Sequence, residues 1–154
     1  MNPFTFGICI RALVFSLSVN PVCFICGLSS TELYAQNSTQ DAIVWNATGF
    51  TDMLSADKEN IPCRFVTKPK TKQVEWVQKQ GANTTLFTIT EAQGEWTELK
   101  RNGSFTFLVS GGGASGKIAI QRDGKKIILT LSLTSASGEI KNEYTISDFY
   151  KLEP

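Results

Sequence analysis

The chain contains no histidine, and this absence removes several chemistries. The usual Ser-His-Asp and Cys-His catalytic arrangements need an imidazole, and so do histidine-rich zinc sites. No stretch fits the D-x-D-x-D-G pattern of a calcium-binding loop. We therefore expect no metal site and no cofactor, and we expect the protein not to be an enzyme.

Cysteine is scarce once the first residues are set aside. Cys9, Cys23 and Cys26 precede residue 36, which leaves Cys63 as the single thiol of the remaining chain. One thiol cannot form an internal disulfide, so the fold must depend on its core. We expect Cys63 to be a buried, small apolar side chain. A dimer linked through Cys63 is the alternative.

Neither sign of charge dominates the sequence. The 15 basic and 14 acidic residues give a formal net charge of +1, and they form no basic block and no acidic tail. This balance argues against a nucleic-acid partner, because such partners need a concentrated positive surface. It also gives no electrostatic reason for binding to an anionic membrane.

A long apolar run lies near the N-terminus. Arg11 precedes "ALVFSLSVNPVCFICGL" (12–28), and the polar "SSTELYAQ" (29–36) follows. This order predicts a signal peptide over 1–35, cleaved after Ala35. A retained membrane anchor is the alternative, but the run is short for a bilayer core of about 30 Å and Asn20-Pro21 interrupts it. We expect residues 36–154 to be one exported domain, secreted or periplasmic, with no membrane span after processing.

Beyond residue 73 the sequence alternates between apolar and polar residues. Phe105, Phe107 and Val109 fall on one face of a strand, and every second residue from Ile127 to Leu133 is apolar. Such alternation is typical of antiparallel strands with one face on a core and the other in water. Turn signals such as Asp123-Gly124 separate the runs, which predicts hairpins.

These runs predict an all-β fold, an antiparallel meander of seven to nine strands. A small up-and-down barrel is favoured because closure removes exposed strand edges. A two-sheet β-sandwich is the alternative. Nearer the N-terminus we expect strands over 42–50 and 61–66, with Pro62 at the start of the second. Between them we expect one helical turn capped by Thr51.

The segment "GGGASGK" (111–117) fits G-x-x-x-x-G-K, the start of a phosphate-binding loop. Such a loop needs a hydroxyl after the lysine to hold magnesium and a helix to follow it. Here Ile118 follows Lys117, and "IAIQRDG" alternates like a strand. We therefore predict a hairpin connection of small residues and no nucleotide site.

Aromatic and aliphatic side chains on the inner face are the candidates for a ligand cavity, because a small barrel either fills itself or holds one small ligand. The candidate lining residues are Trp76, Phe87, Phe105, Phe107, Leu129 and Tyr144. A filled core is the other interpretation. Trp96 is expected in the core or at a barrel end.

The densest acidic cluster is Glu91, Glu95 and Glu98. Two carboxylates at a defined separation are sufficient for glycoside hydrolysis. On an alternating strand Glu98 would share a face with Trp96, as in a sugar-binding cleft. Pairing of Glu98 with a neighbouring lysine is the favoured interpretation.

Sequons for N-glycosylation occur at Asn37, Asn46, Asn83 and Asn102. In a secretory pathway that glycosylates such sites, they would carry glycans on surface loops. A mobility shift after deglycosylation would test this.

The stretch "GEWTELKRNGSFTFLVSGGGASGKIAIQRDGKKIILTL" (94–131) resembles small secreted lipocalin-like (calycin-type) β-barrel proteins of Bacteroidetes-type bacteria. Their repeats have a Trp-bearing strand, a "dG" or "nG" turn, an "sftF" strand and a glycine loop, and their leaders end similarly to "YAQ". The resemblance implies an exported barrel. Lipocalins carry G-x-W near the first strand, but here Gly94-Glu95-Trp96 lies later and Trp45 lacks that glycine. No site residue is therefore carried over.

The leading functional hypothesis is an exported, non-enzymatic β-barrel protein that binds a small apolar ligand or a partner at the cell envelope. A structural or inhibitory interaction module with a filled core is the alternative. A carboxylate-dependent hydrolase is the third and least favoured hypothesis.

Overall fold

The computed structural model describes residues 40–152, most of which lie in β-strands. The strands are β1 (Ile43–Asp52), β2 (Lys58–Glu59), β3 (Cys63–Lys68), β4 (Gln73–Gln78), β5 (Asn83–Gln93), β6 (Gly103–Gly111), β7 (Ala114–Asp123), β8 (Lys126–Ser135) and β9 (Gly138–Lys151). Two short 3-10 turns, η2 (Pro69–Thr71) and η3 (Lys79–Gly81), join strands. The predicted signal peptide (1–35) and the sequon at Asn37 lie outside the described residues. Within the described part, no helix has the length and apolar character to cross a membrane.

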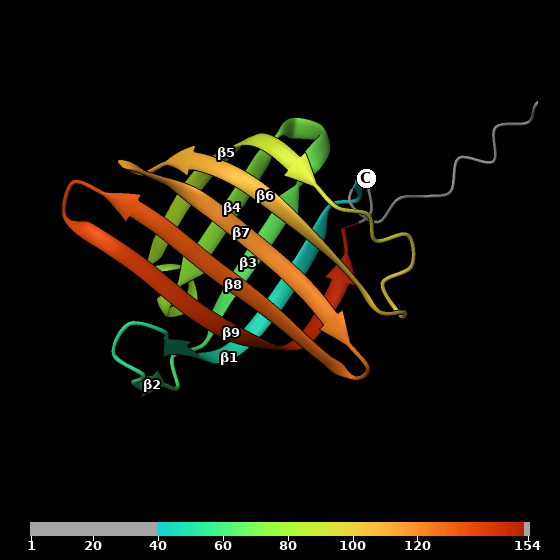
Figure 1. Cartoon of the computed structure of the whole chain (residues 1–154), viewed down its shortest axis with the longest axis horizontal. Coiled ribbons are helices and arrows are strands. Elements are labelled where there is room, and N and C mark those ends of the chain that lie inside the picture. The colour runs from blue at the N-terminus through green and yellow to red at the C-terminus, as the bar shows by residue number, and fades with distance from the viewer. Residues whose placement is uncertain (1–39, 153–154) are drawn as a thin grey trace, which may run out of the picture. The chain divides into compact units, whose positions relative to one another are not determined.

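The strands form one antiparallel sheet that closes on itself (Figure 1). Neighbouring strands in the sheet follow one another in the chain from β3 to β9, and β1 pairs with both β3 and β9. Eight strands therefore make a closed barrel, and the short β2 pairs with β1 outside the ring. This confirms the predicted meander and barrel. The sandwich alternative is wrong, because the β1–β9 pairing leaves a single continuous sheet.

The alternation along β8 shows why the sequence forms this barrel. Ile127, Leu129, Leu131 and Leu133 are buried inside, whereas the residues between them face outward. Burying an apolar side chain of this size stabilises a fold by about 1.5–3 kcal/mol. Because side chains in a strand switch faces at each residue, the pattern decides which face of β8 becomes the inner wall.

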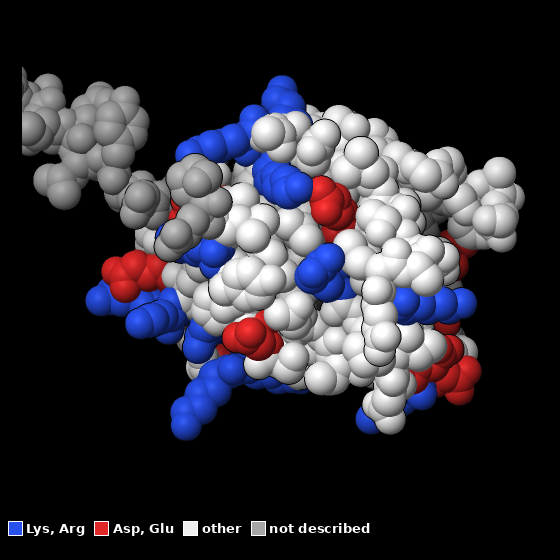
Figure 2. All heavy atoms as spheres, turned by 180° about the vertical axis from the view of Figure 1, so that it is seen from behind, with Lys and Arg blue, Asp and Glu red and all other residues white. Residues whose placement is uncertain are grey.

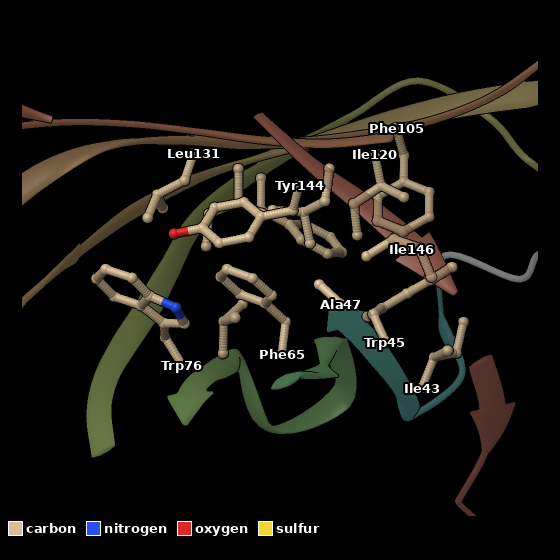
Figure 3. Packing of buried hydrophobic residues seen from close by; sticks show 14 of the residues in the cluster. Ile43, Trp45, Ala47, Phe65, Trp76, Phe105, Ile120, Leu131, Tyr144 and Ile146 are labelled. Atoms are coloured by element: carbon tan, nitrogen blue, oxygen red, sulfur yellow. The ribbon is translucent and has the colours of Figure 1, made fainter. Parts of the chain in front are cut away.

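Aromatic rings fill much of the interior (Figure 3). Phe65 stacks on its cross-strand neighbour Trp76, with ring centroids 5.9 Å apart. The Tyr144 ring meets Phe65 edge-on at 4.9 Å, and Phe105 and Phe107 lie 4.9 Å apart. Edge-on and offset contacts of this kind add to the stabilisation from buried area.

The segment between β1 and β2 has the predicted turn but not the predicted cap. β1 runs through Thr51 to Asp52, and residues 53–55 form a single turn of α-helical type, closed by a bond between residues 52 and 56. The Asp52 carboxylate accepts the N–H of Leu54 at 2.7 Å, and the Asp52 carbonyl accepts the N–H of Ala56 at 2.8 Å. Asp52 and not Thr51 therefore organises the turn, because a short carboxylate satisfies backbone donors two residues ahead and ends the strand.

Candidate functional site

One end of the barrel is closed by the loop 94–102, which lies at the right in Figure 1. Trp96 and Leu99 from this loop are buried in the core, and the Trp96 ring stacks on Trp45 at 6.0 Å. The Trp96 indole N–H donates to the carbonyls of Glu98 (2.8 Å) and Arg101 (3.0 Å). The prediction that Trp96 lies in the core or at a barrel end is confirmed.

Arg122 holds this loop against the barrel. Its Nη1 donates to the Leu99 carbonyl at 2.8 Å, and its Nε donates to the Gly124 carbonyl at 2.9 Å. The guanidinium also lies 6.0 Å from the centroid of the Phe149 ring. These contacts come from β7, its hairpin and β9, so the loop is tied to several strands. The loop thereby covers this end of the barrel.

The other end of the barrel carries a pocket of about 350 Å³, which we call the mouth. Its lining comes from the first half of β5 and from the β6–β7 and β8–β9 hairpins, among other residues. These two hairpins lie at the left in Figure 1. Apolar side chains pointing into the barrel form its floor and walls, and small or hydroxyl-bearing residues form its rim. The lining residues are Trp76, Thr85, Phe87, Gly111, Gly112, Gly113, Ala114, Leu133, Ser135, Ala136, Ser137 and Ile140. Pockets of roughly 300 Å³ and more are typical of small-molecule sites.

The glycine segment shapes one side of the mouth. Gly111 pairs with Ala114, so Gly112 and Gly113 form a two-residue hairpin turn, and both have positive φ (59° and 76°). Turns of this type need positive φ at both positions, which glycine adopts without steric cost. Lys117 lies in β7, paired with Ser132. The segment is therefore a hairpin, as predicted, and not a phosphate-binding loop.

The six predicted lining residues all point into the barrel and are buried. Trp76 and Phe87 line the mouth. The remaining four, namely Phe105, Phe107, Leu129 and Tyr144, lie in the packed core. Figure 3 shows Phe105 and Tyr144 there. Sequence reasoning placed Leu133 and Ile140 on the inner face but did not select them for the site. Their position next to the β8–β9 turn is the feature of the sequence that could have identified them as residues near a barrel end.

Polar groups lie within the apolar interior close to Trp76. The Trp76 indole N–H is buried and has no hydrogen-bond partner among residues 40–152. Asn142, which is also buried, donates from Nδ2 to the Tyr144 hydroxyl at 3.3 Å. Burial raises the pKa of Tyr144 well above its ordinary value, with the Asn142 hydrogen bond partly opposing this. The Tyr144 hydroxyl therefore stays protonated at neutral pH.

Cys63 begins β3 and is 9% exposed. Burial raises the pKa of its thiol to about 11, and a weak contact with the Trp76 N–H, outside normal hydrogen-bond geometry, partly opposes the rise. The thiolate is the reactive form of cysteine, so it is scarce here at neutral pH. The scarcity of thiolate weighs against a disulfide between two copies of the folded chain.

A second pocket, of about 410 Å³, adjoins Cys63 and is lined mainly by residues of β1, β3 and β4.

The raised pKa of Cys63 predicts a loss of stability in alkali. In the unfolded chain the thiol loses its proton near pH 9, whereas in the folded protein it does so near pH 11. The folded state thus holds more protons between these values, and the free energy of unfolding falls as pH rises from 9 to 11. Urea denaturation should show that the free energy of unfolding falls less between these pH values for Cys63→Ala than for the unchanged protein. If it falls equally with pH in both proteins, the raised pKa of Cys63 is contradicted.

The acidic cluster does not form a carboxylate pair at the mouth. The prediction that Glu98 shares a strand face with Trp96 is wrong, because residues 94–102 form a loop that folds over the barrel end. The Glu98 carboxylate pairs with Arg101 at 2.9 Å, and not with a lysine as expected. Glu91, on β5, accepts a hydrogen bond from Gln93. None of these carboxylates lines the mouth.

Charged side chains of both signs are interspersed on the face shown in Figure 2. Most of that face is covered by uncharged residues, and acidic groups lie among the basic ones. This arrangement agrees with the near-zero net charge of the sequence. It offers no concentrated positive surface on this face of the kind that a nucleic-acid backbone needs.

The eight-stranded antiparallel barrel is consistent with a lipocalin-like fold. Its sequence was compared with models of protein families and with curated proteins, and its structure with solved structures. These comparisons found no match.

Proposed function

We propose that the protein binds a small, mostly apolar ligand in the mouth of its barrel, as a lipocalin-like binding protein. The observation that carries this proposal is the contrast between the two ends. The loop with Trp96 and Leu99 covers one end of the barrel. The other end has a pocket of about 350 Å³, whose lining includes Trp76, Phe87 and Leu133. Apolar walls with a few polar groups are the usual lining of such sites.

Exposed apolar residues near the same end support this location. Met53 (47% exposed) and Leu54 (58%) lie in the turn after β1, and the Met53 N–H donates to the Lys141 carbonyl of β9 at 2.7 Å. This bond places the turn beside Ile140, which lines the mouth. A surface of this kind favours the approach of an apolar molecule, since contact removes apolar area from water.

Filling the mouth should abolish binding. Leu133→Trp places a large side chain in the pocket, whereas Thr134→Trp adds the same side chain to the outer face of the same strand. We expect the neutral dye N-phenyl-1-naphthylamine to gain fluorescence with the unchanged protein and with Thr134→Trp. Leu133→Trp should weaken the dye's binding at least about tenfold, since it removes most of its apolar contact area. Equal affinity of both variants would place the dye elsewhere.

The second candidate is a structural or inhibitory module that contacts an envelope protein. The exposed Met53, Leu54 and Ile61 around β2 favour it, because they form an apolar surface outside the barrel. This function needs no ligand, so it predicts that neither the dye nor other apolar probes bind at the mouth. Replacing Met53 and Leu54 with serine would then weaken the protein–protein contact, which crosslinking in envelope extracts would measure.

For either function we propose that the chain is exported, in agreement with the signal peptide expected over 1–35. The mature protein would begin at Gln36. N-terminal sequencing of protein recovered from the envelope or the medium would test the processing; an intact Met1 would contradict it.

A further inference from the structure

The pocket of about 410 Å³ adjoins the place where β1 and β3 separate. The two strands pair no further than Ala47 and Cys63, after which β1 pairs with β2. The register between β1 and β9 also shifts on either side of Ala47. We call this space the wall pocket. Its lining residues are Asn46, Ala47, Thr48, Pro62, Cys63, Arg64, Val77, Gln80 and Ser147.

Three of the lining residues are cross-strand neighbours. Arg64 on β3 lies opposite Asn46 on β1 and opposite Val77 on β4. Directly opposed side chains emerge on the same face of a sheet. This is the outer face, because Arg64 alternates with Cys63 and Phe65, which point into the core. The wall pocket is therefore a hollow on the outside of the barrel, and it shares no lining residue with the mouth.

Arg64 is the one charged side chain among the described residues that line the wall pocket. It is exposed and forms no ion pair or hydrogen bond with another residue of 40–152. The other two arginines of this range are engaged, Arg101 by a carboxylate and Arg122 by backbone carbonyls. Asp148 lies opposite Asn46 on β9 but does not line the pocket. A guanidinium beside a hollow, with no carboxylate in the lining, favours an anion.

Amide side chains supply further donors at the same place. Asn46 and Gln80 both line the wall pocket, and neither side chain is bonded to another residue within 40–152. Gln80 also has a left-handed backbone, with φ 54° and ψ 32°. A residue with a Cβ adopts this conformation at a cost in folding free energy, whereas glycine does not incur it. Strained residues of this kind cluster at functional sites.

We propose that the wall pocket binds a small organic carboxylate through Arg64, a second site beyond the proposed function of the mouth. The planar guanidinium matches a carboxylate through two parallel N–H···O bonds, and the amides of Asn46 and Gln80 supply further donors. Ala47 and Val77 offer apolar surface to the carbon body of the ligand. The volume of about 410 Å³ exceeds the roughly 30 Å³ of one water molecule more than tenfold, so an organic anion has room there.

Benzoate and benzamide test the charge, because they have nearly the same shape and only benzoate is an anion at pH 7. NMR titrations would use protein from a host that does not glycosylate Asn46. We expect benzoate to bind at least about tenfold more tightly than benzamide and to shift the side-chain amide signals of Asn46 and Gln80. Arg64→Gln should remove this preference. Arg101→Gln makes the same change at an exposed arginine outside the pocket and should retain the preference.

The backbone strain at Gln80 provides a second test. Gln80→Gly removes an amide donor from the pocket and relieves the left-handed conformation of a residue with a side chain. We expect it to raise the midpoint of thermal unfolding while weakening benzoate binding at least about threefold. A residue that serves only the turn would change the midpoint and leave benzoate binding as it is.

The outcomes separate this site from the mouth. No saturable binding of benzoate, equal affinity for benzamide, or unchanged affinity in Arg64→Gln would each overturn the wall-pocket proposal. Leu133→Trp fills the mouth and should leave benzoate binding unchanged; if it abolishes that binding, the anion binds in the mouth and this proposal is wrong. A failure of N-phenyl-1-naphthylamine to bind would contradict the proposed function alone. Should Arg64→Gln not fold, the comparison of benzoate with benzamide and the shifted amide signals still decide.

Discussion

Replacing Trp45 with alanine is expected to lower the free energy of unfolding by about 3–5 kcal/mol, the usual cost of removing a large buried aromatic side chain. Trp45 is fully buried and stacks on Phe149 at 5.6 Å as well as on Trp96 at 6.0 Å. Its indole N–H donates to the Thr67 hydroxyl at 3.1 Å. The substitution would remove all of these contacts and leave a cavity under the closing loop.

Urea denaturation followed by circular dichroism would measure this effect. A domain of this size has a stability of about 5–15 kcal/mol, so the variant could lose a large share of its folded population. Thr134→Ala is the matched control, since Thr134 is exposed on β8, and its effect should stay within about 0.5 kcal/mol. A loss below 1 kcal/mol for Trp45→Ala would mean that the loop 94–102 moves into the cavity left by the indole, or that its packing on Trp45 contributes little to the free energy of unfolding.

Adding a single methyl group at Gly116 is expected to be nearly as damaging. A Cβ on Gly116 would lie 2.0 Å from the Ser132 carbonyl oxygen and 2.9 Å from the Leu133 Cα. These are backbone atoms of the neighbouring strand, and Gly116 pairs with Leu133 in the register of β7 and β8. The methyl group can be accommodated only if the two strands separate.

We therefore expect Gly116→Ala to destabilise the protein by at least about 3 kcal/mol, at the upper end of the range for overpacking. Ser115→Ala, at the exposed neighbouring position of β7, should change stability by less than about 0.5 kcal/mol. Thermal unfolding of both variants would measure the difference. Equal stability of the two proteins would show that β7 and β8 tolerate a wider separation at this point. Because Leu133 lines the mouth, Gly116→Ala should also weaken dye binding.

Both predictions concern the scaffold that holds the mouth open. Trp45 secures the closed end through its contact with Trp96, and Gly116 allows β7 and β8 to approach closely near the open end. A barrel that is firmly packed at one end can keep a preformed pocket at the other. Preformed sites avoid the ordering cost that a flexible site pays on binding. The proposed binding of a small, mostly apolar ligand depends on this difference between the two ends.

Much of the fold could be predicted from the sequence by itself. The alternation in 127–133 determines which residues of β8 face inward, because successive side chains of a strand point to opposite faces. The glycines at 112 and 113 and the small residues around 136 mark the hairpins. The absence of histidine and the presence of only one cysteine, Cys63, after residue 35 limit the chemistry of residues 36–154 whatever their fold.

The location of the site was decided only by the tertiary structure. The loop 94–102 contains the alternating "EWTEL", which resembles a strand, but the burial of Trp96 and Leu99 at the barrel end outweighs that local preference. Alternation also cannot show that β1 pairs with β9, about a hundred residues later in the chain. One contact between these two strands is the hydrogen bond that the Ser147 hydroxyl donates to the Asn46 carbonyl.

Closure of the barrel through the β1–β9 pairing decides which end the loop 94–102 covers and which end carries the mouth. It also separates Trp76 and Phe87, which line the mouth, from Phe105, Phe107, Leu129 and Tyr144 in the packed core. The period-two pattern is local and identifies only a face of each strand. The depth of a residue within the barrel depends on how all eight strands are staggered around it.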